Sequence, residues 1–221
     1  MKKKFSTRPD KITEPWCTWQ GFLTAMPSLV FVVTGWKSNG KENACLQSWS
    51  AFVGGGKDEF VCIMSAVSKS GHMYQSLKET GVCVLNFPSY DIYDRCIKTI
   101  GNNELETDEI TAAGLTVERA VKVNAPRIKE CFLNIECEFL WEHKLFENAG
   151  FFGNRDVTVA LKAVNICFDS DRYDQSKLGR YGKTGYLFQI DNPTNPDTGE
   201  RTQSIMSGSV ELNDPIPWAT K

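Results

Sequence analysis

The sequence predicts a mainly β protein built on an antiparallel sheet, and two observations support this class. Runs rich in β-branched and aromatic residues recur along the chain, and glycine-containing turns separate the earliest of them. Strands that follow one another through tight turns pair antiparallel, because a parallel pair needs a long crossover connection. We therefore expect a barrel or sandwich of six to seven strands with short helices. The strand-like runs are residues 29–34, 44–50, 60–67, 82–87, 132–141 and 157–168.

Turn residues and glycines mark the limits of these elements. The segments KSNG (37–40) and GGGKD (54–58) have the composition of hairpin turns. Short helices are expected where a polar and apolar pattern ends on a glycine, which readily takes the left-handed conformation that closes a helix. The expected helices are 72–80 before Gly81, 92–100 before Gly101, and 107–113 before Gly114.

The composition is that of one ordinary globular domain spanning residues 1–221. A net charge of −2 argues against a nucleic-acid-binding surface and against an electrostatic membrane anchor. The basic residues 2–4 precede a polar segment instead of the apolar core of a signal peptide, and no apolar run is long enough to cross a membrane. We therefore expect a cytoplasmic protein.

The chain from about residue 191 onward is rich in proline, glycine, asparagine and aspartate. This composition predicts an extended C-terminal tail that crosses the surface of the molecule or of a partner subunit. Ordering such a tail by itself is costly in conformational entropy, so we expect it to dock on a second protomer in a homodimer.

Eight cysteines are the unusual feature of the composition. No two of them form a Cys-x-x-Cys pair, and several lie in strand-like runs, where a free cysteine behaves as a small buried hydrophobic residue. The two histidines, His72 and His143, lack the paired short spacings of a zinc site. We therefore expect reduced core thiols and no structural metal. The cysteines stand at positions 17, 45, 62, 83, 96, 131, 137 and 167.

Familiar catalytic and nucleotide-binding motifs are absent from the sequence. The segment GGGK (54–57) lacks the first glycine of a phosphate-binding loop, and Lys57 is followed by Asp58 instead of a hydroxyl residue. It also lacks the third glycine of a dinucleotide-binding fingerprint, and no Gly-x-Ser-x-Gly elbow occurs. The acidic residues are scattered over polar loops, so the evident hydrolase classes have no support.

The segment SKSGH (68–72) does suggest a binding site. It places two hydroxyls, an ammonium group and an imidazole at the expected start of a short helix, where unpaired backbone N–H groups and a partial positive charge favour an anion. The alternative is that Ser70 only caps the helix and Lys69 is solvated.

A neighbouring stretch is also too polar for a simple core strand. It places Asn43, Gln47, Ser48, Trp49 and Ser50 in the strand expected just before the one that leads into Ser68. Amide, hydroxyl and indole groups suit the wall of a groove that binds a flat polar heterocycle. Two alternatives stay open: the strand is amphipathic with its polar face in water, and Trp49 is a core residue.

Three blocks of sequence, in a fixed order, carry a resemblance to a known family. The first is LVFVVTGWKSNGKENACLQSWSAF (29–52), and the second is VCIMSAVSKSGHMYQSLKETGVCVLNFPS (61–89), which ends on an Asn-x-Pro-Ser signature. The third and weaker block is LGRYGKTGY (178–186). Together they resemble the flavin reductase-like, FMN-binding split-barrel proteins, particularly the flavoredoxin branch. The resemblance implies a split β-barrel of Greek-key type.

The resemblance also implies a cofactor and its site. FMN would bind non-covalently in a groove at a homodimer interface, with residues 43–50 facing the isoalloxazine ring and the ribityl chain. The segment 68–72 would hold the phosphate. Met73 stands where many members carry Thr or Ser, which predicts weaker FMN binding than is usual. The expected FMN-binding residues are Asn43, Gln47, Ser48, Trp49, Ser50, Ser68, Lys69, Ser70 and His72.

The chemistry that the resemblance implies is electron transfer through FMN, from NADH or NADPH to an unidentified acceptor. Hydride transfer to a flavin needs no side-chain acid or base, so we name no catalytic residue. Two other functions stay open. One is a flavoredoxin-like electron carrier that is reduced by a protein partner, and the other is a flavin-less barrel that binds another ligand or acts as an interaction module.

Overall fold

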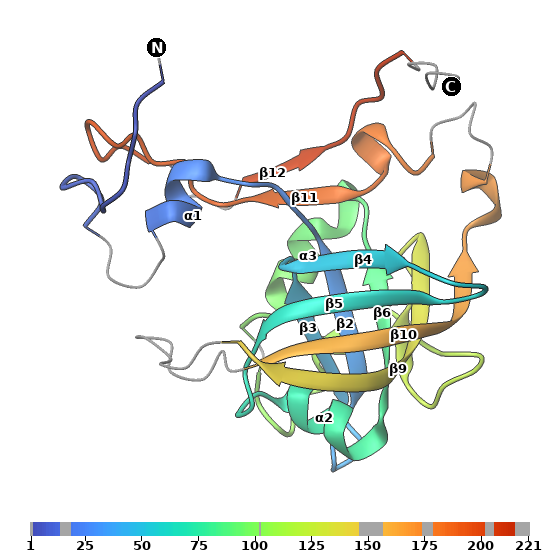
Figure 1. The fold of residues 1–221 in the computed structure, drawn as a ribbon. Coiled ribbons are helices and arrows are strands. Elements are labelled where there is room, and N and C mark those ends of the chain that lie inside the picture. The colour runs from blue at the N-terminus through green and yellow to red at the C-terminus, as the bar shows by residue number, and fades with distance from the viewer. Residues whose placement is uncertain are drawn as a thin grey trace.

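The computed structural model describes residues 2–13, 19–101, 103–145, 157–173, 179–201 and 206–214. Its centre is a seven-stranded antiparallel sheet with the strand order β3-β2-β6-β9-β10-β5-β4, which confirms the mainly β class (Figure 1). Cys17, and Leu178 in the third block of sequence, lie outside the described residues. The seven strands are β2 (Phe31–Trp36), β3 (Glu42–Gln47), β4 (Ser50–Gly54), β5 (Phe60–Val67), β6 (Val82–Phe87), β9 (Leu133–Lys144) and β10 (Val157–Phe168).

The connection between the two edge strands shows that this sheet is a barrel. β3 and β4 lie at opposite edges of the sheet, yet only Ser48 and Trp49 separate them in the chain. The three Cα–Cα steps from Gln47 to Ser50 span at most about 11 Å, whereas seven flat strands spaced about 4.8 Å apart would place the edges about 30 Å from each other. The sheet must therefore curl until its edges meet. Because β3 and β4 do not pair with each other, the barrel is split between them.

One predicted strand is wrong in a way that matters for the site. The sequence predicts a single strand over 44–50, but β3 ends at Gln47 and β4 begins at Ser50. The Trp49 carbonyl already accepts a hydrogen bond of 2.9 Å from the Ser65 N–H, so the chain has crossed to the β5 side by this residue. The predicted strands 60–67, 82–87 and 157–168 have the limits of β5, β6 and β10.

The helices are short, as predicted. α2 (His72–Thr80) ends on Gly81, which has a φ of 69°, and α4 (Glu109–Ala112) is followed by Gly114 with a φ of 78°. α3 (Tyr93–Lys98) ends before Thr99, so Gly101 does not close it in the expected left-handed conformation. None of the helices in the described part of the chain is long and apolar enough to cross a membrane. The remaining helical elements are α1 (Trp19–Thr24), η1 (Tyr90–Ile92), η2 (Ser170–Arg172) and η4 (Gly182–Thr184).

A second, three-stranded sheet has the order β1-β11-β12 and uses the C-terminal part of the chain. In the region from about residue 191, where the sequence predicts an extended tail, the chain turns back through a bridge between Thr194 and Arg201, and β12 pairs with β11. Figure 1 shows the N-terminal segment, α1 and the turn after β11 projecting together beside the barrel. The strands outside the barrel are β1 (Ser28–Leu29), β11 (Leu187–Ile190), β12 (Met206–Ser209), β7 (Val117–Arg119) and β8 (Pro126–Ile128).

Candidate functional site

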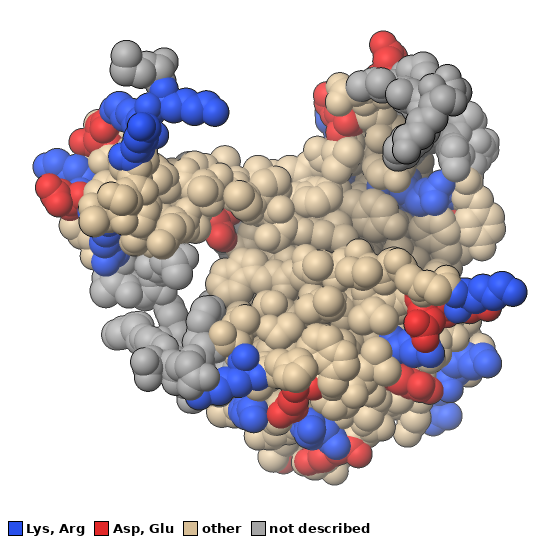
Figure 2. Space-filling view, viewed as in Figure 1, with Lys and Arg blue, Asp and Glu red and all other residues tan. Residues whose placement is uncertain are grey.

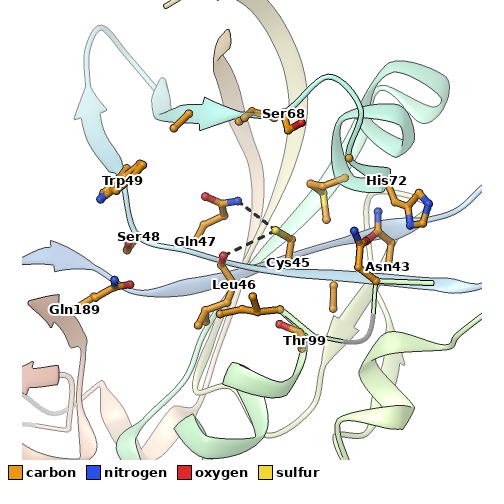
Figure 3. A pocket seen from close by; sticks show the side chains of 17 residues that line it. Asn43, Cys45, Leu46, Gln47, Ser48, Trp49, Ser68, His72, Thr99 and Gln189 are labelled. Atoms are coloured by element: carbon orange, nitrogen blue, oxygen red, sulfur yellow. Dashed lines mark hydrogen bonds between the residues drawn. The ribbon is translucent and has the colours of Figure 1, made fainter. Parts of the chain in front are cut away.

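A cavity of about 390 Å³ lies beside the split of the barrel (Figure 3). One wall is β3 with its link to β4, and the facing wall is the end of β5, the following loop and the start of α2. The segment after α3 and one residue of β11 complete the lining. Six of the nine residues predicted from the sequence line this cavity: Asn43, Gln47, Ser48, Trp49, Ser68 and His72.

A β-bulge directs the end of β5 toward the cavity. Val157 on β10 is opposite Val67, whereas Val159 is opposite Met64, so β5 carries one extra residue here. Ala66 lies at this position with a φ of 58°, a left-handed conformation that is uncommon for a residue with a Cβ. Bulges bend a strand and often re-aim side chains beside functional sites. Here the bulge brings 66–68 onto the cavity wall.

The start of α2 forms the end of the cavity where an anion would be favoured. Gly71 is the N-cap residue, and the first backbone hydrogen bond of the helix runs from the Gln75 N–H to the Gly71 carbonyl, at 3.2 Å. The N–H groups of the first turn therefore have no acceptor within the helix, and the helix dipole adds a partial positive charge. Ser68 and His72 flank these groups on the cavity wall.

Three predicted site residues do not line this cavity. The Ser70 hydroxyl lies 3.0 Å from that of Ser68, and the helix has no side-chain cap, so the alternative of a Ser70 cap is also wrong. Lys69 points to the other side of the loop, where its ammonium group lies 3.3 Å from a carboxylate oxygen of Glu142. Ser50 is the first residue of β4, and its hydroxyl is buried beyond the cavity wall. Adjacent side chains in an extended segment point to opposite sides, and the sequence spacing alone does not tell which of them faces the cavity.

β3 presents a thiol and an amide side by side in the cavity. The Gln47 amide donates a hydrogen bond of 3.2 Å to the Cys45 sulfur, and Figure 3 shows both side chains projecting from the strand. Burial raises the pKa of the Cys45 thiol, so the thiol stays protonated and uncharged at neutral pH. Gln47 and Cys45 therefore give this wall a polar but neutral character.

A buried ion pair lies behind β3, one wall of the cavity. The Lys37 ammonium group lies 2.8 Å from one oxygen of Glu109, and each side chain is only 1% exposed. The second Glu109 oxygen accepts a hydrogen bond of 2.6 Å from the Ala44 N–H on β3. Nearby, the Asn43 amide donates to the Ser76 hydroxyl at 2.9 Å, which joins β3 to α2. His72 Nδ1 lies 4.0 Å from Glu109, so the same carboxylate faces both walls of the site.

The structure adds lining residues that the sequence did not indicate. Thr99, Ile100 and Asn103 follow α3, and Gln189 comes from β11. All four lie far along the chain from the motifs at 43–50 and 68–72, and no local pattern marks them. The pairing of β11 with β1, which sets Gln189 opposite Ser28, explains how Gln189 reaches the site.

The fold and the site together define a class of protein: a split antiparallel barrel with a polar cavity between its edge strand and a helix N-terminus. Residues 23–166 match the family model described as the flavin reductase like domain. The chain belongs to this family, and the predicted family is therefore confirmed.

Solved structures with the same fold cover nearly the whole chain. Nitrilotriacetate monooxygenase component B from Bacillus cereus has a TM-score of 0.75 at 16% identity, over 98% of this chain and 100% of that one. Flavoredoxin of Desulfovibrio vulgaris has a TM-score of 0.68 at 15% identity, over 99% and 98%. An FMN-binding protein from Thermus thermophilus, solved with bound 1-cyclohex-2-enone, has a TM-score of 0.67 at 15% identity, over 98% and 100%. At these identities the likeness shows the split-barrel fold.

Two relatives match by sequence over part of their length. One, from Methanothermobacter thermautotrophicus, is 27% identical over 116 residues, which are 52% of this chain and 52% of the relative. The other, from Aquifex aeolicus, is 25% identical over 118 residues, which are 51% of this chain and 58% of the relative. Both are described as uncharacterized proteins, and the chain spans only a little over half the length of each.

Proposed function

We propose that this protein binds FMN in the cavity beside the barrel split and transfers electrons from NADH or NADPH, through the flavin, to an acceptor. The coarser part of this statement, a flavin-related oxidoreductase, rests on membership of the flavin reductase-like family. The identity of the flavin, the nicotinamide donor and the residues that hold the flavin are the proposal.

The single observation that carries the proposal is the chemistry at the two ends of one cavity. The first-turn N–H groups of α2, with Ser68 and His72, offer hydrogen-bond donors at one end, as a phosphate requires. Along β3, Asn43 and Gln47 offer amide groups to the edge of a flat heterocycle, and Trp49 adds an aromatic surface. A cofactor with a phosphate at one end and a polar ring at the other fits this arrangement.

The protein's contribution is to position the reactants. Bound FMN would supply the redox chemistry, by accepting a hydride from the nicotinamide donor. Gln47 and the backbone of β3 would orient the ring, while the first turn of α2 would fix the phosphate and thereby the register of the cofactor. Holding two reacting rings in a defined geometry removes much of the entropic barrier to their reaction. We name no side chain as a proton donor or acceptor.

We also propose that the protein is a homodimer. Figure 2 shows that the hollow face over β4, β11 and β12 carries few charged side chains, whereas Lys, Arg, Asp and Glu gather on the lower part of the barrel. Val53 on β4 and Leu212 after β12 are 50% and 52% exposed. Apolar groups on an uncharged hollow surface favour burial against a second copy. A monomer mass by light scattering at micromolar concentration would contradict this.

The first experiment is an absorbance spectrum of the purified protein, with chromatography of whatever acid releases, followed by titration with FMN. Flavin bands and released FMN would support the site, and stopped-flow reduction by NADH or NADPH would then identify the donor. A protein that binds FMN but is not reduced by either nucleotide would be the electron carrier considered above. A protein that stays colourless after FMN is added would overturn the proposal.

We further propose a reducing, cytoplasmic setting. In the part of the chain that the structure describes, all seven cysteines are free thiols, although several lie close to one another in the core. Free thiols in such proximity persist where the surroundings are reducing.

A further inference from the structure

A second cavity, of about 370 Å³, lies on the other side of the loop that follows β5. Residues 68–71 of this loop separate it from the flavin cavity, because Ser68 and Gly71 line the first cavity whereas Lys69 lines the second. The two cavities thus share one short wall. The lining residues of the second cavity, among those the structure describes, are Lys69, Glu142, His143, Lys144 and Val157.

The strand register explains why these residues meet. Val157, the first residue of β10, pairs with Lys144 on β9 and with Val67 on β5. His143 pairs with Thr158, one step further along the same ladder. The end of β9, the start of β10 and the end of β5 therefore converge at one end of the barrel, where Lys69 follows two residues after Val67.

The lining carries more positive than negative groups. Lys69 and Lys144 contribute two ammonium groups against the single carboxylate of Glu142. That carboxylate already contacts Lys69 and Lys78, each at 3.3 Å, and accepts hydrogen bonds of 3.1 and 3.0 Å from the Tyr74 hydroxyl. Burial alone would raise the pKa of Glu142, but these donors lower it below its ordinary value. Glu142 is therefore ionised and holds Lys69 at the edge of the cavity.

A flat aromatic group lies next to this charged lining. The Trp141 ring is 39% exposed, and its centroid is 4.9 Å from that of the His143 imidazole, with 52° between the ring planes. Side chains alternate along a strand, so Trp141 flanks the cavity from the His143 side of β9, while Glu142 and Lys144 project from the other side. An exposed indole at one side of the cavity and lysines at the other suit a ligand with both a base and a phosphate, because the base can stack while the lysines bind the phosphate. A bare phosphate would leave the indole unused.

We propose that this second cavity binds the adenylate half of the nicotinamide dinucleotide donor, with Lys144 and Lys69 contacting its phosphate groups. The inference rests on the proposed function, because the nicotinamide must reach the flavin in the adjoining cavity. The adenylate phosphate of a dinucleotide is linked directly to the nicotinamide phosphate. A ligand that crosses the rim of the loop 68–71 can therefore place one half in each cavity.

The decisive experiment compares dinucleotide and mononucleotide reductants in a Lys144→Ala variant. NADPH and NADH carry the adenylate half, whereas reduced nicotinamide mononucleotide lacks it. We expect the variant to raise the KM for the dinucleotides about tenfold, the loss typical of one charge-assisted contact. The KM for the mononucleotide and the affinity for FMN should not change. Lys144→Arg should recover part of the loss.

Lys78→Ala is the matched control, because Lys78 contacts the same Glu142 but does not line the cavity. Its KM for the dinucleotides should stay within about twofold of the wild type. An equal rise in KM for the dinucleotides and the mononucleotide in Lys144→Ala would overturn the inference, since Lys144 would then act on the flavin site.

A second measurement keeps this inference separate from the flavin proposal. Calorimetric titration of the protein with ADP, without any flavin, tests the second cavity directly. Binding of ADP that is lost in Lys144→Ala supports the site even where FMN fails to bind. Absence of ADP binding in the wild type, or inorganic phosphate binding as tightly as ADP, would overturn the assignment to a nucleotide.

Discussion

The outer face of the barrel beneath β8 and the wall of the cavity beside the barrel split both bury polar side chains, but they use them differently. On the outer face of β6, Asn86 is fully paired: its amide nitrogen donates to the carbonyls of Val32 and Val84 and to Thr34, while its oxygen accepts from Ile128 on β8 and from Asn134.

On the cavity wall the first turn of α2 has N–H groups without an acceptor in the helix, and His72 Nδ1 is buried with no hydrogen-bond partner among the described residues. Buried polar groups are nearly always hydrogen-bonded in native proteins. A fully hydrogen-bonded side chain such as Asn86 therefore has a structural role. A ligand is expected at a wall whose polar groups lack hydrogen-bond partners within the protein.

Glu109 supports the cavity wall through the Ala44 N–H, and removing its side chain should have the largest effect on stability. Glu109→Ala would leave Lys37 as an uncompensated buried charge and would also remove the acceptor of the Ala44 N–H. We expect unfolding to require about 3–5 kcal/mol less, measured by urea denaturation, together with weaker FMN binding. Lys41→Ala is the matched control, because Lys41 pairs with Asp108 at 2.8 Å while both side chains are more than a third exposed. The control should lose far less stability, because solvent screens an exposed ion pair.

Equal losses of unfolding free energy in Glu109→Ala and Lys41→Ala would contradict the expected difference between the buried and the exposed ion pair. A sharper variant replaces Lys37 by Met and Glu109 by Leu together. Removing both charges should restore much of the stability that Glu109→Ala loses, since no buried charge is left unpaired. FMN affinity should stay low in this double variant, because the Ala44 N–H on the cavity wall still lacks its acceptor.

Asn86→Ala should be the next largest change and should affect stability alone. It leaves the Ile128 N–H and the Asn134 amide without their shared acceptor inside a fully buried region. We expect a loss of at least about 2 kcal/mol in the free energy of unfolding. Asn39→Ala serves as the control, because Asn39 is exposed: its amide donates to Leu105 and Glu106 and accepts from the Lys41 N–H, all in an exposed turn. A change in FMN affinity in the folded Asn86 variant would place Asn86 in the site and contradict its structural role.

Much of the barrel could be predicted from the sequence because its strands are long and bounded by glycine turns. β5, β6 and β10 have the predicted limits, and Gly81 closes α2 as expected. The division of 44–50 into β3 and β4 could not be predicted, because it depends on closure of the barrel and not on local propensity. The same closure decides which residues of that stretch line the cavity. Ser50 was predicted to line it, but Ser50 belongs to β4 and lies outside the cavity.

The site was predicted only where its residues are neighbours in the chain. Ser68 and His72 line the cavity as the segment suggested, whereas Lys69 between them points away to Glu142, some seventy residues further along the sequence. The pairing partner of Lys69 depends on α2 packing beside β9, which no local pattern reveals. Thr99, Asn103 and Gln189 reach the cavity for the same kind of reason.

His72→Ala should weaken FMN binding with little effect on stability, which would sharpen the contrast with Asn86. His72 lines the cavity at the first turn of α2, so its removal takes away one donor at the expected phosphate end. We expect about a tenfold rise in the Kd for FMN, measured by fluorescence titration. Gln75→Ala, an exposed position on the same helix, is the control and should bind FMN as the wild type does. Riboflavin, which lacks the phosphate, should bind wild type and His72→Ala equally well, and a tenfold difference for riboflavin too would argue against a phosphate contact.

The smallest effect expected concerns pH and Glu136, another fully paired group of the barrel region. Burial by itself would raise the pKa of Glu136, but the N–H groups of residues 121–123 and the Asn165 amide all donate to its carboxylate and lower the pKa below its ordinary value. A carboxyl group with a lowered pKa in the folded state adds stability above its unfolded pKa, and this stability is lost as the pH falls through the folded pKa.

Glu136→Gln should therefore be less stable than wild type at pH 7, and the difference should shrink below about pH 4.5, by at most about 1.4 kcal/mol per pH unit. Urea denaturation at several pH values measures this difference. A gap between the two proteins that stays constant down to acid pH would mean that the carboxylate charge contributes nothing, and that shape and neutral hydrogen bonds alone hold the segment 121–123 against β9.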